Sequence, residues 1–383
     1  MSKDAKNVPA LRFKGYSDAW EKRKVSDYLC ESRIPGSNGL KAKKLTVKLW
    51  GKGVVPKNET YSGSIKTKYY VRSANQLIYG KLDFLHAAFG IVPQSLDGWE
   101  STIDSPAFDV NTSIGNAAFL LALFLKPNFY LREGIRANGS RKAKRIHEDT
   151  FLSMSISAPQ RKEQNQIAMV LDKTEFLIAA TQHKIDALEQ AKKALLQRLF
   201  DQSWRFKGYS DPWEKRKLGD ILNYEQPTPY IVRSENYQNS FPTPVLTAGK
   251  SLLLGYTNET NGIKSASKSS PVIIFDDFTT SSHLIDFPFK IKSSAMKILS
   301  PSNNDSDIYF SFGLLSSINY VSKNHERHWI SQFSNFRVQV PSVHEQACVS
   351  RVLLNVTDLI AATQSRLSSL ELLKKALLQD LFI

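Results

Sequence analysis

The sequence predicts an α+β protein in which two globular α/β domains are joined and separated by two long antiparallel coiled-coil helices, with a pseudo-twofold internal repeat. Three observations predict this class. One phrase of thirteen residues opens each half of the chain, and one phrase of nine residues closes each half. Each closing phrase also ends a stretch of about forty residues with helical periodicity, and a repeated pattern of this kind decides the architecture.

The repeat consists of matching ends and unlike middles. Residues 12–24 read RFKGYSDAWEKRK and residues 205–217 read RFKGYSDPWEKRK, which lie 193 positions apart. Residues 192–200 read KKALLQRLF and residues 374–382 read KKALLQDLF, which lie 182 positions apart. The stretch between the shared phrases is therefore 11 residues longer in the first copy. This pattern predicts one frame that carries two different inserts.

The two helices are expected over residues 159–200 and 341–382. Each stretch begins with a proline, which is tolerated at a helix entry, and neither contains a later proline or glycine. Apolar residues recur every seven positions, which is typical of a coiled-coil seam, although each helix could instead pack only on its own globular segment. Forty residues of helix span about 60 Å. The predicted seam consists of Leu171, Ile178, Ile185, Leu188, Leu195, Leu353, Ile360, Leu367, Leu370 and Leu377.

The inserts contain short β-branched and aromatic runs bounded by Gly, Pro, Asn and Ser, which indicate strands and turns. Residues 77–84 and 271–279 are examples. The longest apolar run, Ala117–Leu125, is too short to cross a bilayer and predicts a buried helix or strand. The expected organisation is a globular domain over 1–155, a helix over 156–203, a second globular domain over 204–337 and a second helix over 338–383.

The charge is strongly basic and unevenly distributed. The net charge of the whole chain is +15. Residues 1–155 hold 25 Lys and Arg against 14 Asp and Glu, whereas residues 201–340 hold 15 against 13. Such a bias favours a polyanionic partner, because Lys and Arg that neutralise phosphates release condensed counterions. The alternative for any single cluster is a solvated surface that keeps the protein soluble.

Nucleic-acid contacts are expected from basic and polar side chains on the inserts. With only two cysteines and no apolar leader at the N-terminus, we expect a cytoplasmic location without a membrane segment. The candidate DNA-binding residues are Lys41, Lys43, Lys44, Lys81, Arg141, Lys142, Arg145, Lys250, Tyr256, Lys264, Lys268, Ser281, His283 and Arg327.

No catalytic or metal-binding constellation emerges from the sequence. The seven histidines form no metal-ligand pair, and no glycine-rich fingerprint follows a strand. Asp276 and Asp277 follow an apolar strand and could hold a metal ion as nuclease carboxylates do. Their more common role is a hydrogen-bonded turn at a strand end. We therefore expect no catalytic residue, no metal and no cofactor in this chain.

The sequence resembles the specificity subunits of type I restriction–modification enzymes. The resemblance covers nearly the whole chain and rests on the two repeated phrases together with LIYGKLDFLHAAFGIVP at 77–93, PVIIFDDFTT at 271–280 and ISQFSNFRVQVPSVHEQ at 330–346. It implies that residues 1–155 and 204–337 are target-recognition domains, each reading one half of a bipartite, asymmetric site in double-stranded DNA. It also implies that the helices are spacers that set the gap between the half-sites.

The resemblance further implies the partners. Two modification subunits, which methylate adenine, dock on the helices, and restriction subunits with motor and nuclease activity join them. S-adenosylmethionine, ATP and magnesium then belong to those subunits, because the specificity subunit itself is non-catalytic. Two other functions remain open: a stand-alone metal-dependent nuclease using Asp276 or Asp277, and a coiled-coil scaffold that binds nucleic acid through bulk charge alone.

Overall fold

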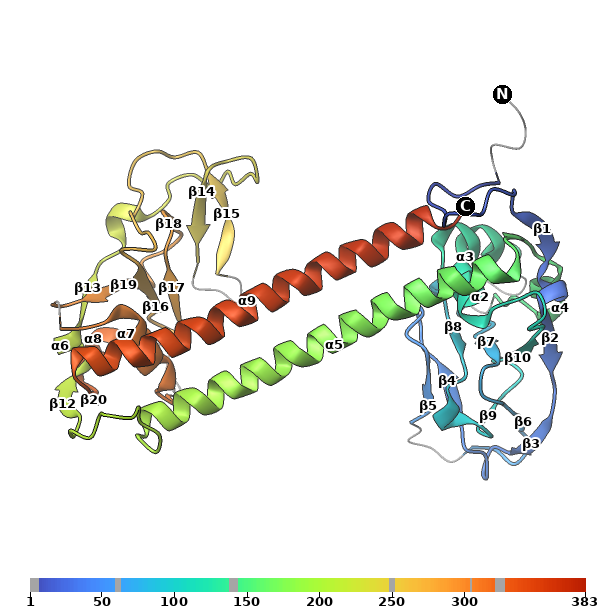
Figure 1. Ribbon diagram of the computed structural model, residues 1–383, viewed down its shortest axis with the longest axis horizontal. Helices are drawn as coiled ribbons and strands as arrows, with labels where there is room; N and C mark the ends of the chain where they lie inside the picture. The colour runs from blue at the N-terminus through green and yellow to red at the C-terminus, as the bar shows by residue number, and fades with distance from the viewer. Residues whose placement is uncertain (1–6, 59–62, 138–143, 248–251, 304, 321–327) are drawn as a thin grey trace. The chain divides into compact units, whose positions relative to one another are not determined.

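A computed structural model describes residues 7–58, 63–137, 144–247, 252–303, 305–320 and 328–383 (Figure 1). The chain forms two compact units. The first unit comprises residues 1–180 and 367–383, and the second comprises residues 181–366. Both long helices pass from one unit to the other, so each unit contains a part of each helix.

The first unit is built on an antiparallel four-stranded sheet with the strand order β2-β10-β7-β8. A three-stranded sheet, β3-β6-β9, and the hairpin β4-β5 lie outside it. The strands are β1 (Glu21–Lys24), β2 (Leu29–Ser32), β3 (Pro35–Asn38), β4 (Leu45–Val47), β5 (Val54–Pro56), β6 (Lys68–Val71), β7 (Leu77–Tyr79), β8 (Phe89–Ile91), β9 (Glu100–Ser101), β10 (Ala107–Val110) and β11 (Ser155–Ala158).

Aromatic side chains fill the core of the first unit. Tyr79 of β7 stacks on Phe108 of β10 with ring centroids 5.9 Å apart, and Phe151 packs against both rings. The apolar run at 117–125 forms a buried helix, as its composition predicts. The helices are α1 (Val25–Tyr28), η2 (Phe84–His86), η3 (Gln94–Leu96), α2 (Ala117–Phe124), α3 (Pro127–Gly134), α4 (Glu148–Ser153) and the start of α5 (Arg161–Phe200).

The second unit repeats the same sheet with different residues. Its antiparallel four-stranded sheet has the order β13-β19-β16-β17, and a three-stranded sheet, β15-β14-β18, lies outside it. The elements are β12 (Glu214–Lys217), α6 (Leu218–Ile221), β13 (Leu222–Glu225), η4 (Thr228–Tyr230), β14 (Thr243–Leu246), β15 (Leu253–Thr257), β16 (Val272–Asp276), β17 (Ser282–Ile285), β18 (Lys290–Ile291), β19 (Met296–Pro301), α7 (Ile308–Ser317), α8 (His328–Ser331), η5 (Phe333–Asn335), β20 (Arg337–Val340) and α9 (Val343–Asp380).

The repeated phrases form the same frame in both units. Strand β1 pairs with β11 so that Glu21 lies opposite Ala158, and β12 pairs with β20 so that Glu214 lies opposite Val340. The two registers correspond residue for residue, because the first partners are 193 positions apart and the second partners 182. The predicted pseudo-twofold repeat is therefore present in the fold.

An arginine of the opening phrase locks each long helix to its frame. Arg12 donates from Nε and Nη2 to the two carboxylate oxygens of Glu163, at 2.9 and 2.7 Å. Arg205 makes the same bidentate contact with Glu345, at 3.0 and 2.7 Å. Both glutamates are buried and lie in the first turn of α5 or α9, and paired fork geometry of this kind is the strongest form of a charge-assisted hydrogen bond. The entry of each helix is therefore fixed against the segment that precedes the first strand of its own unit.

The two long helices are continuous and lie antiparallel within each unit. In the first unit, the end of α9 packs beside the start of α5, and Lys374 forms an ion pair of 2.9 Å with Glu175. In the second unit, Leu195 and Leu199 of α5 pack in the same cluster as Leu353 of α9. Of the predicted seam residues, Leu171, Ile185, Leu353 and Ile360 are buried and the other six are half-buried.

Each helix ends inside the unit from which it did not start. Phe382, just beyond α9, stacks on Phe119 of the first unit at 5.2 Å and 18° and lies edge-on to Trp20. Phe200, at the end of α5, packs on Phe310 and Trp213 of the second unit. The repeated closing phrase is therefore a docking element, and every unit needs both helices to complete its core.

Candidate nucleic-acid interface

A lysine-rich surface lies on the outer strands of the first unit. Residues 36–71 contain eight lysines and one glutamate, Glu59. Among the residues that the structure describes, six of these lysines are exposed and take part in no ion pair. We call them the first-unit lysines: Lys41, Lys43, Lys48, Lys52, Lys66 and Lys68.

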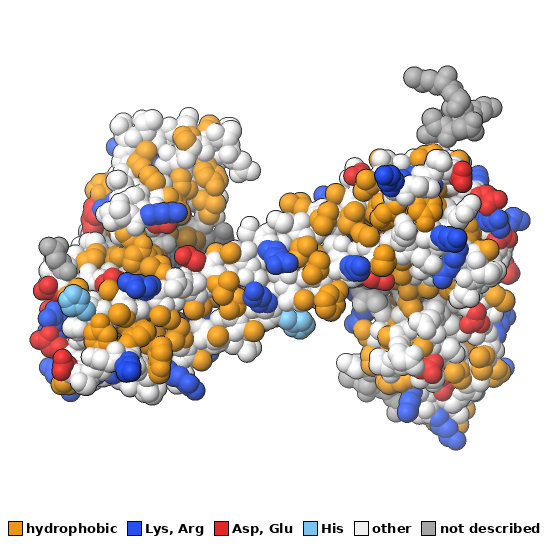
Figure 2. All heavy atoms as spheres, in the orientation of Figure 1, with side chains coloured by type: hydrophobic (Ala, Val, Ile, Leu, Met, Phe, Trp, Pro, Cys, Tyr) orange, Lys and Arg blue, Asp and Glu red, His pale blue; other side chains and the backbone are white. Residues whose placement is uncertain are grey.

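Backbone hydrogen bonds bring several first-unit lysines together. Asn38 lies opposite Lys68 in the β3–β6 pair, and the Gly39 amide donates to the carbonyls of Ser64 and Thr67, both at 3.1 Å. The amide of Glu100 donates to the Lys43 carbonyl at 2.7 Å. The turn that carries Lys41 and Lys43 is therefore held against the turn that carries Lys66. Blue side chains are visible over the lower edge of this unit in Figure 2, where β3, β5 and β6 lie in Figure 1.

The first-unit lysines include only part of the residues that the sequence singled out. Lys41 and Lys43 belong to them, and Lys44 lies beside them with its ammonium 5.7 Å from the ring centre of Tyr69. The sequence analysis did not single out the other four first-unit lysines, because they occur singly along strands and turns and form no run. These are Lys48, Lys52, Lys66 and Lys68. The excess of lysine over acidic residues in the whole 36–71 stretch is the signal that finds them.

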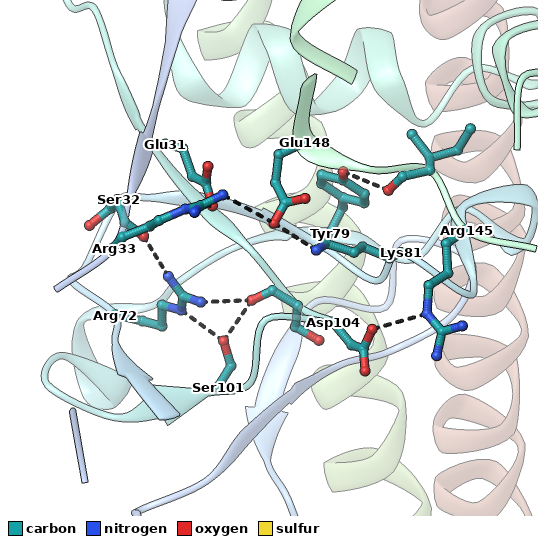
Figure 3. Close-up of polar contacts among 12 residues, drawn as sticks. Glu31, Ser32, Arg33, Arg72, Tyr79, Lys81, Ser101, Asp104, Arg145 and Glu148 are labelled. Carbon is teal, nitrogen blue, oxygen red and sulfur yellow. Dashed lines mark hydrogen bonds and ion pairs between the residues drawn. The ribbon is translucent and has the colours of Figure 1, made fainter. Parts of the chain in front are cut away.

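Lys81 differs from the surface contact that the sequence suggested. Its side chain is only 4% exposed, and its ammonium lies 2.6 Å from a carboxylate oxygen of Glu148. Figure 3 shows Glu148 between Lys81 and Arg33, whose guanidinium is 3.8 Å from the same oxygen. A buried ammonium needs such a partner because an uncompensated buried charge is very costly. Lys81 therefore holds α4 to the strand end after β7.

Arg145 is half-exposed and anchored. Its Nε lies 3.1 Å from a carboxylate oxygen of Asp104, and the next residue, Ile146, accepts a hydrogen bond of 2.9 Å from the Tyr79 hydroxyl (Figure 3). The Ile146 amide donates to the Lys81 carbonyl. These contacts fix the backbone at 145–148 against β7.

A buried arginine, Arg72, connects the strands next to this region. Arg72 is 2% exposed and donates to Ser101 Oγ at 2.7 Å and to the Ser32 carbonyl at 2.8 Å (Figure 3). Burial lowers the pKa of Arg72 to about 10. Its hydrogen bonds join β2, β9 and the turn at Ser105, so it stabilises the outer sheet and does not face a ligand.

The candidate residues of the second unit are engaged to different degrees. Lys264 pairs with Glu225 and lies over the Tyr230 ring, 5.2 Å from its centre. Lys268 is exposed, Tyr256 is half-buried beside a groove of about 470 Å³, and Ser281 is exposed at the turn before β17. His283 is half-buried in β17, and its burial lowers the pKa of the imidazole.

Asp276 and Asp277 form the strand-end turn that the sequence favoured. Asp276 accepts hydrogen bonds from the Phe278 amide, at 3.0 Å, and from the Thr279 hydroxyl. Asp277 accepts from the Trp329 amide at 2.8 Å and lies 3.6 Å from the ammonium of Lys297, which is fully buried. Within the described ranges, no group of three His, Cys, Asp or Glu side chains could hold a metal ion. Both carboxylates are committed to the fold, and nothing supports the nuclease alternative.

Four candidates lie outside the described residues: Arg141, Lys142, Lys250 and Arg327. For the parts of the chain that are described, no helix combines the length and the apolar character that spanning a membrane requires.

The long helices expose apolar side chains as well as burying a seam. On α5, Phe176 is 71% exposed, and on α9, Leu372 is 69% exposed. Figure 2 shows hydrophobic side chains interspersed with basic ones over both helices. Exposed apolar groups gathered on a helix surface are typical of a protein contact.

Comparisons with known proteins agree on one class. Residues 210–372 match the family model of the type I restriction modification DNA specificity domain. A specificity subunit of the type I restriction enzyme EcoR124I/EcoR124II from Escherichia coli is 42% identical over 162 residues, which are 39% of this chain. The match spans about two fifths of that relative's length, 40%.

The fold is also similar over the whole chain to a solved structure. The S subunit of the type I restriction–modification system of M. genitalium superposes with a TM-score of 0.66 and 14% identity, covering 98% of this chain and 99% of that one. At that level of identity the similarity concerns the fold alone, and it includes both units and both long helices.

Proposed function

We propose that this chain is the DNA-recognition subunit of a type I restriction–modification enzyme, because residues 210–372 match the DNA specificity domain of that family and a specificity subunit is 42% identical over 162 residues. Each unit reads one half of a bipartite site in double-stranded DNA. The two half-sites are unlike each other, because the two inserts differ in length, sequence and charge.

One observation carries this proposal: the frame is repeated and the binding surfaces are not. Arg12 with Glu163 and Arg205 with Glu345 reproduce one contact in both units. In contrast, the outer sheets have different strand orders, and within the described residues a cluster of six exposed lysines without ion pairs lies in the first unit and not in the second. A duplicated enzyme or ligand-binding protein is expected to repeat its site. A chain that repeats everything except its sites is suited to recognising two different half-sites with one architecture.

The helices supply the second part of the proposed function. Helix α5 is 40 residues long and therefore spans about 60 Å, which exceeds one turn of duplex at about 34–36 Å. A helix pair of that length sets the gap between the half-sites. Its exposed apolar residues, such as Phe176 and Leu372, provide contacts for two modification subunits, and restriction subunits join that complex.

The chemistry of the enzyme belongs to those partners. S-adenosylmethionine is expected on the modification subunits, and ATP and magnesium on the restriction subunits. The contribution of this chain is recognition and spacing in the cytoplasm, where it has access to the chromosome.

The proposal is tested by co-expressing the chain with the modification subunit of its own system in a host that lacks adenine methylation. Methylated adenine is then mapped across the genome. We expect methylation at a single motif with two specific parts separated by unspecified bases. Methylation without a motif would favour the scaffold that binds through bulk charge, and magnesium-dependent cleavage by the purified chain alone would favour the nuclease.

A further inference from the structure

The cations of the two outer sheets are engaged differently. In the first unit, the first-unit lysines are exposed and form no ion pair among the described residues. In the second unit, three described lysines of the corresponding region are paired with carboxylates, whereas Arg233 and Lys268 are exposed and form no ion pair among the described residues. Lys264 pairs with Glu225, Lys290 lies 3.0 Å from Glu259, and Lys292 lies 2.8 Å from Glu235.

The lysines of the second unit also differ from the first-unit lysines in their burial. Lys290 is 3% exposed and also donates to the Asn261 carbonyl at 2.6 Å, while Lys297 of β19 is fully buried and donates to the Gln226 side chain. These ammonium groups are already desolvated and hydrogen-bonded inside the fold. A phosphate could gain little from them, because each is neutralised by its own carboxylate or buried from solvent.

We propose that the first unit supplies most of the phosphate neutralisation when the chain binds DNA, and that the second unit reads its half-site with far fewer phosphate contacts. This inference rests on the proposed function and adds a division of roles to it. The first unit anchors the complex on any duplex through its lysines. The second unit contributes sequence discrimination through hydrogen bonds and apolar contacts.

The physical reason is counterion release. Each phosphate neutralised by a lysine releases about 0.9 of a condensed counterion from B-DNA, so the logarithm of the binding constant falls linearly with the logarithm of the salt concentration. Lysines that are already paired with a carboxylate contribute less, since the carboxylate balances part of their charge. The salt dependence of binding therefore reports the first unit, and base substitutions in the second half-site change affinity without changing that dependence.

An acidic protein is the alternative ligand for the first-unit lysines. The first-unit lysines come from β6, the β4–β5 hairpin and the turns at 38–44 and 64–67. They are spread along 28 residues of sequence from Lys41 to Lys68, in which Glu59 is the one acidic residue. An extended field of one sign, interrupted by aromatic residues such as Trp50 and Tyr70, matches a duplex backbone. If replacing these lysines released the modification subunit from the complex, the lysines would bind a protein and not DNA.

The experiment measures DNA binding by the complete complex with its modification subunits, using fluorescence anisotropy with a duplex that contains the mapped bipartite site. Potassium chloride is varied between about 50 and 200 mM, the range over which phosphate contacts change affinity most clearly. The test variant replaces Lys41, Lys43, Lys66 and Lys68 with glutamine. The matched control replaces Lys264 and Lys292 of the second unit with glutamine.

We expect the test variant to reduce the steepness of the salt dependence by about 0.9 for each lysine that contacts a phosphate, up to about 3.6 for all four. The motif that is methylated stays the same, and the matched control leaves the salt dependence unchanged. The inference is overturned if both variants reduce the steepness equally, or if the test variant leaves it unchanged while subunit assembly weakens. Failure of the proposed function is distinguishable, because it would appear as the absence of a bipartite motif in the wild-type complex.

Discussion

Lys81 and Glu148 show how a single buried ion pair joins distant segments of the first unit. The two side chains are 4% and 7% exposed, and they join the end of β7 to α4 across 67 residues of sequence. Arg33 approaches the same carboxylate from the surface. The pair therefore fixes the region in which Arg145 and Ile146 are held, and its role is structural.

Replacing Lys81 with methionine tests this role. The change leaves Glu148 buried without its closest cation, and breaking a buried pair by removing one partner costs about 3 to 5 kcal/mol of folding free energy. Chemical denaturation of the variant is the measurement. The double variant Lys81→Met/Glu148→Leu should recover most of the loss, because apolar residues of similar volume often replace a buried pair without cost. A single variant with full stability and a shallower salt dependence of DNA binding would show instead that Lys81 contacts phosphate.

The residue scale also shows what the sequence could not supply. Lys81 follows a hydrophobic strand and glycine, and its buried partner Glu148 is distant in sequence, so nothing local distinguished it from a surface lysine. The role of Asp276 was predictable because a strand-end turn depends on neighbouring residues, here Phe278 and Thr279, whereas the contacts of Asp277 with Trp329 and Lys297 join distant segments. Hydrogen bonds between neighbouring residues can be predicted from the sequence, whereas ion pairs between distant residues are known only from the fold.

At the scale of elements, the closing phrase KKALLQ-x-LF has a second role beyond the helix seam. Phe382 is 4% exposed in the aromatic cluster formed with Trp20 and Phe119, although it follows Trp20 by more than 350 residues. Phe200 occupies the related position in the second unit. Each unit thus completes its own core with the end of a helix that begins in the other.

Replacing Phe382 with alanine should destabilise the first unit by about 3 to 5 kcal/mol, the usual cost of removing a buried phenylalanine. Hydrogen exchange read separately for the two units is the measurement, and the loss of protection should appear at Phe119 and Ile167 before Phe310. Leu372→Ala is the control on the same helix, because Leu372 is 69% exposed and should change stability by less than about 0.5 kcal/mol. Equal loss of protection in both units would contradict the separate cores.

The long helices were the most predictable elements and the outer strands the least. Seven-residue periodicity over residues 159–200 and 341–382 predicted α5 and α9 closely, since a seam held over several turns is a strong signal. The outer strands are only two to five residues long, and their pairing across sheets such as β3-β6-β9 depends on contacts between distant segments. The packing of Phe200 and Phe382 was also not predicted, because the sequence of a helix end does not show which unit it packs against.

At the scale of the whole molecule, we propose that the inserts recognise DNA and that the repeated frame supplies what the two units share. The matched registers of β1–β11 and β12–β20 mean that one insert can be exchanged without altering the strands that hold it. The helices and their docking residues lie outside the inserts, so assembly with partner subunits should survive such an exchange.

The central claim is tested most directly by exchanging residues 26–155 for the corresponding region of a related specificity subunit with a different known motif, and mapping methylated adenine in cells that also express the modification subunit. We expect one half of the bipartite motif to change to that of the donor, while the other half and the gap between them stay the same. A motif in which both halves change, or neither does, would contradict it.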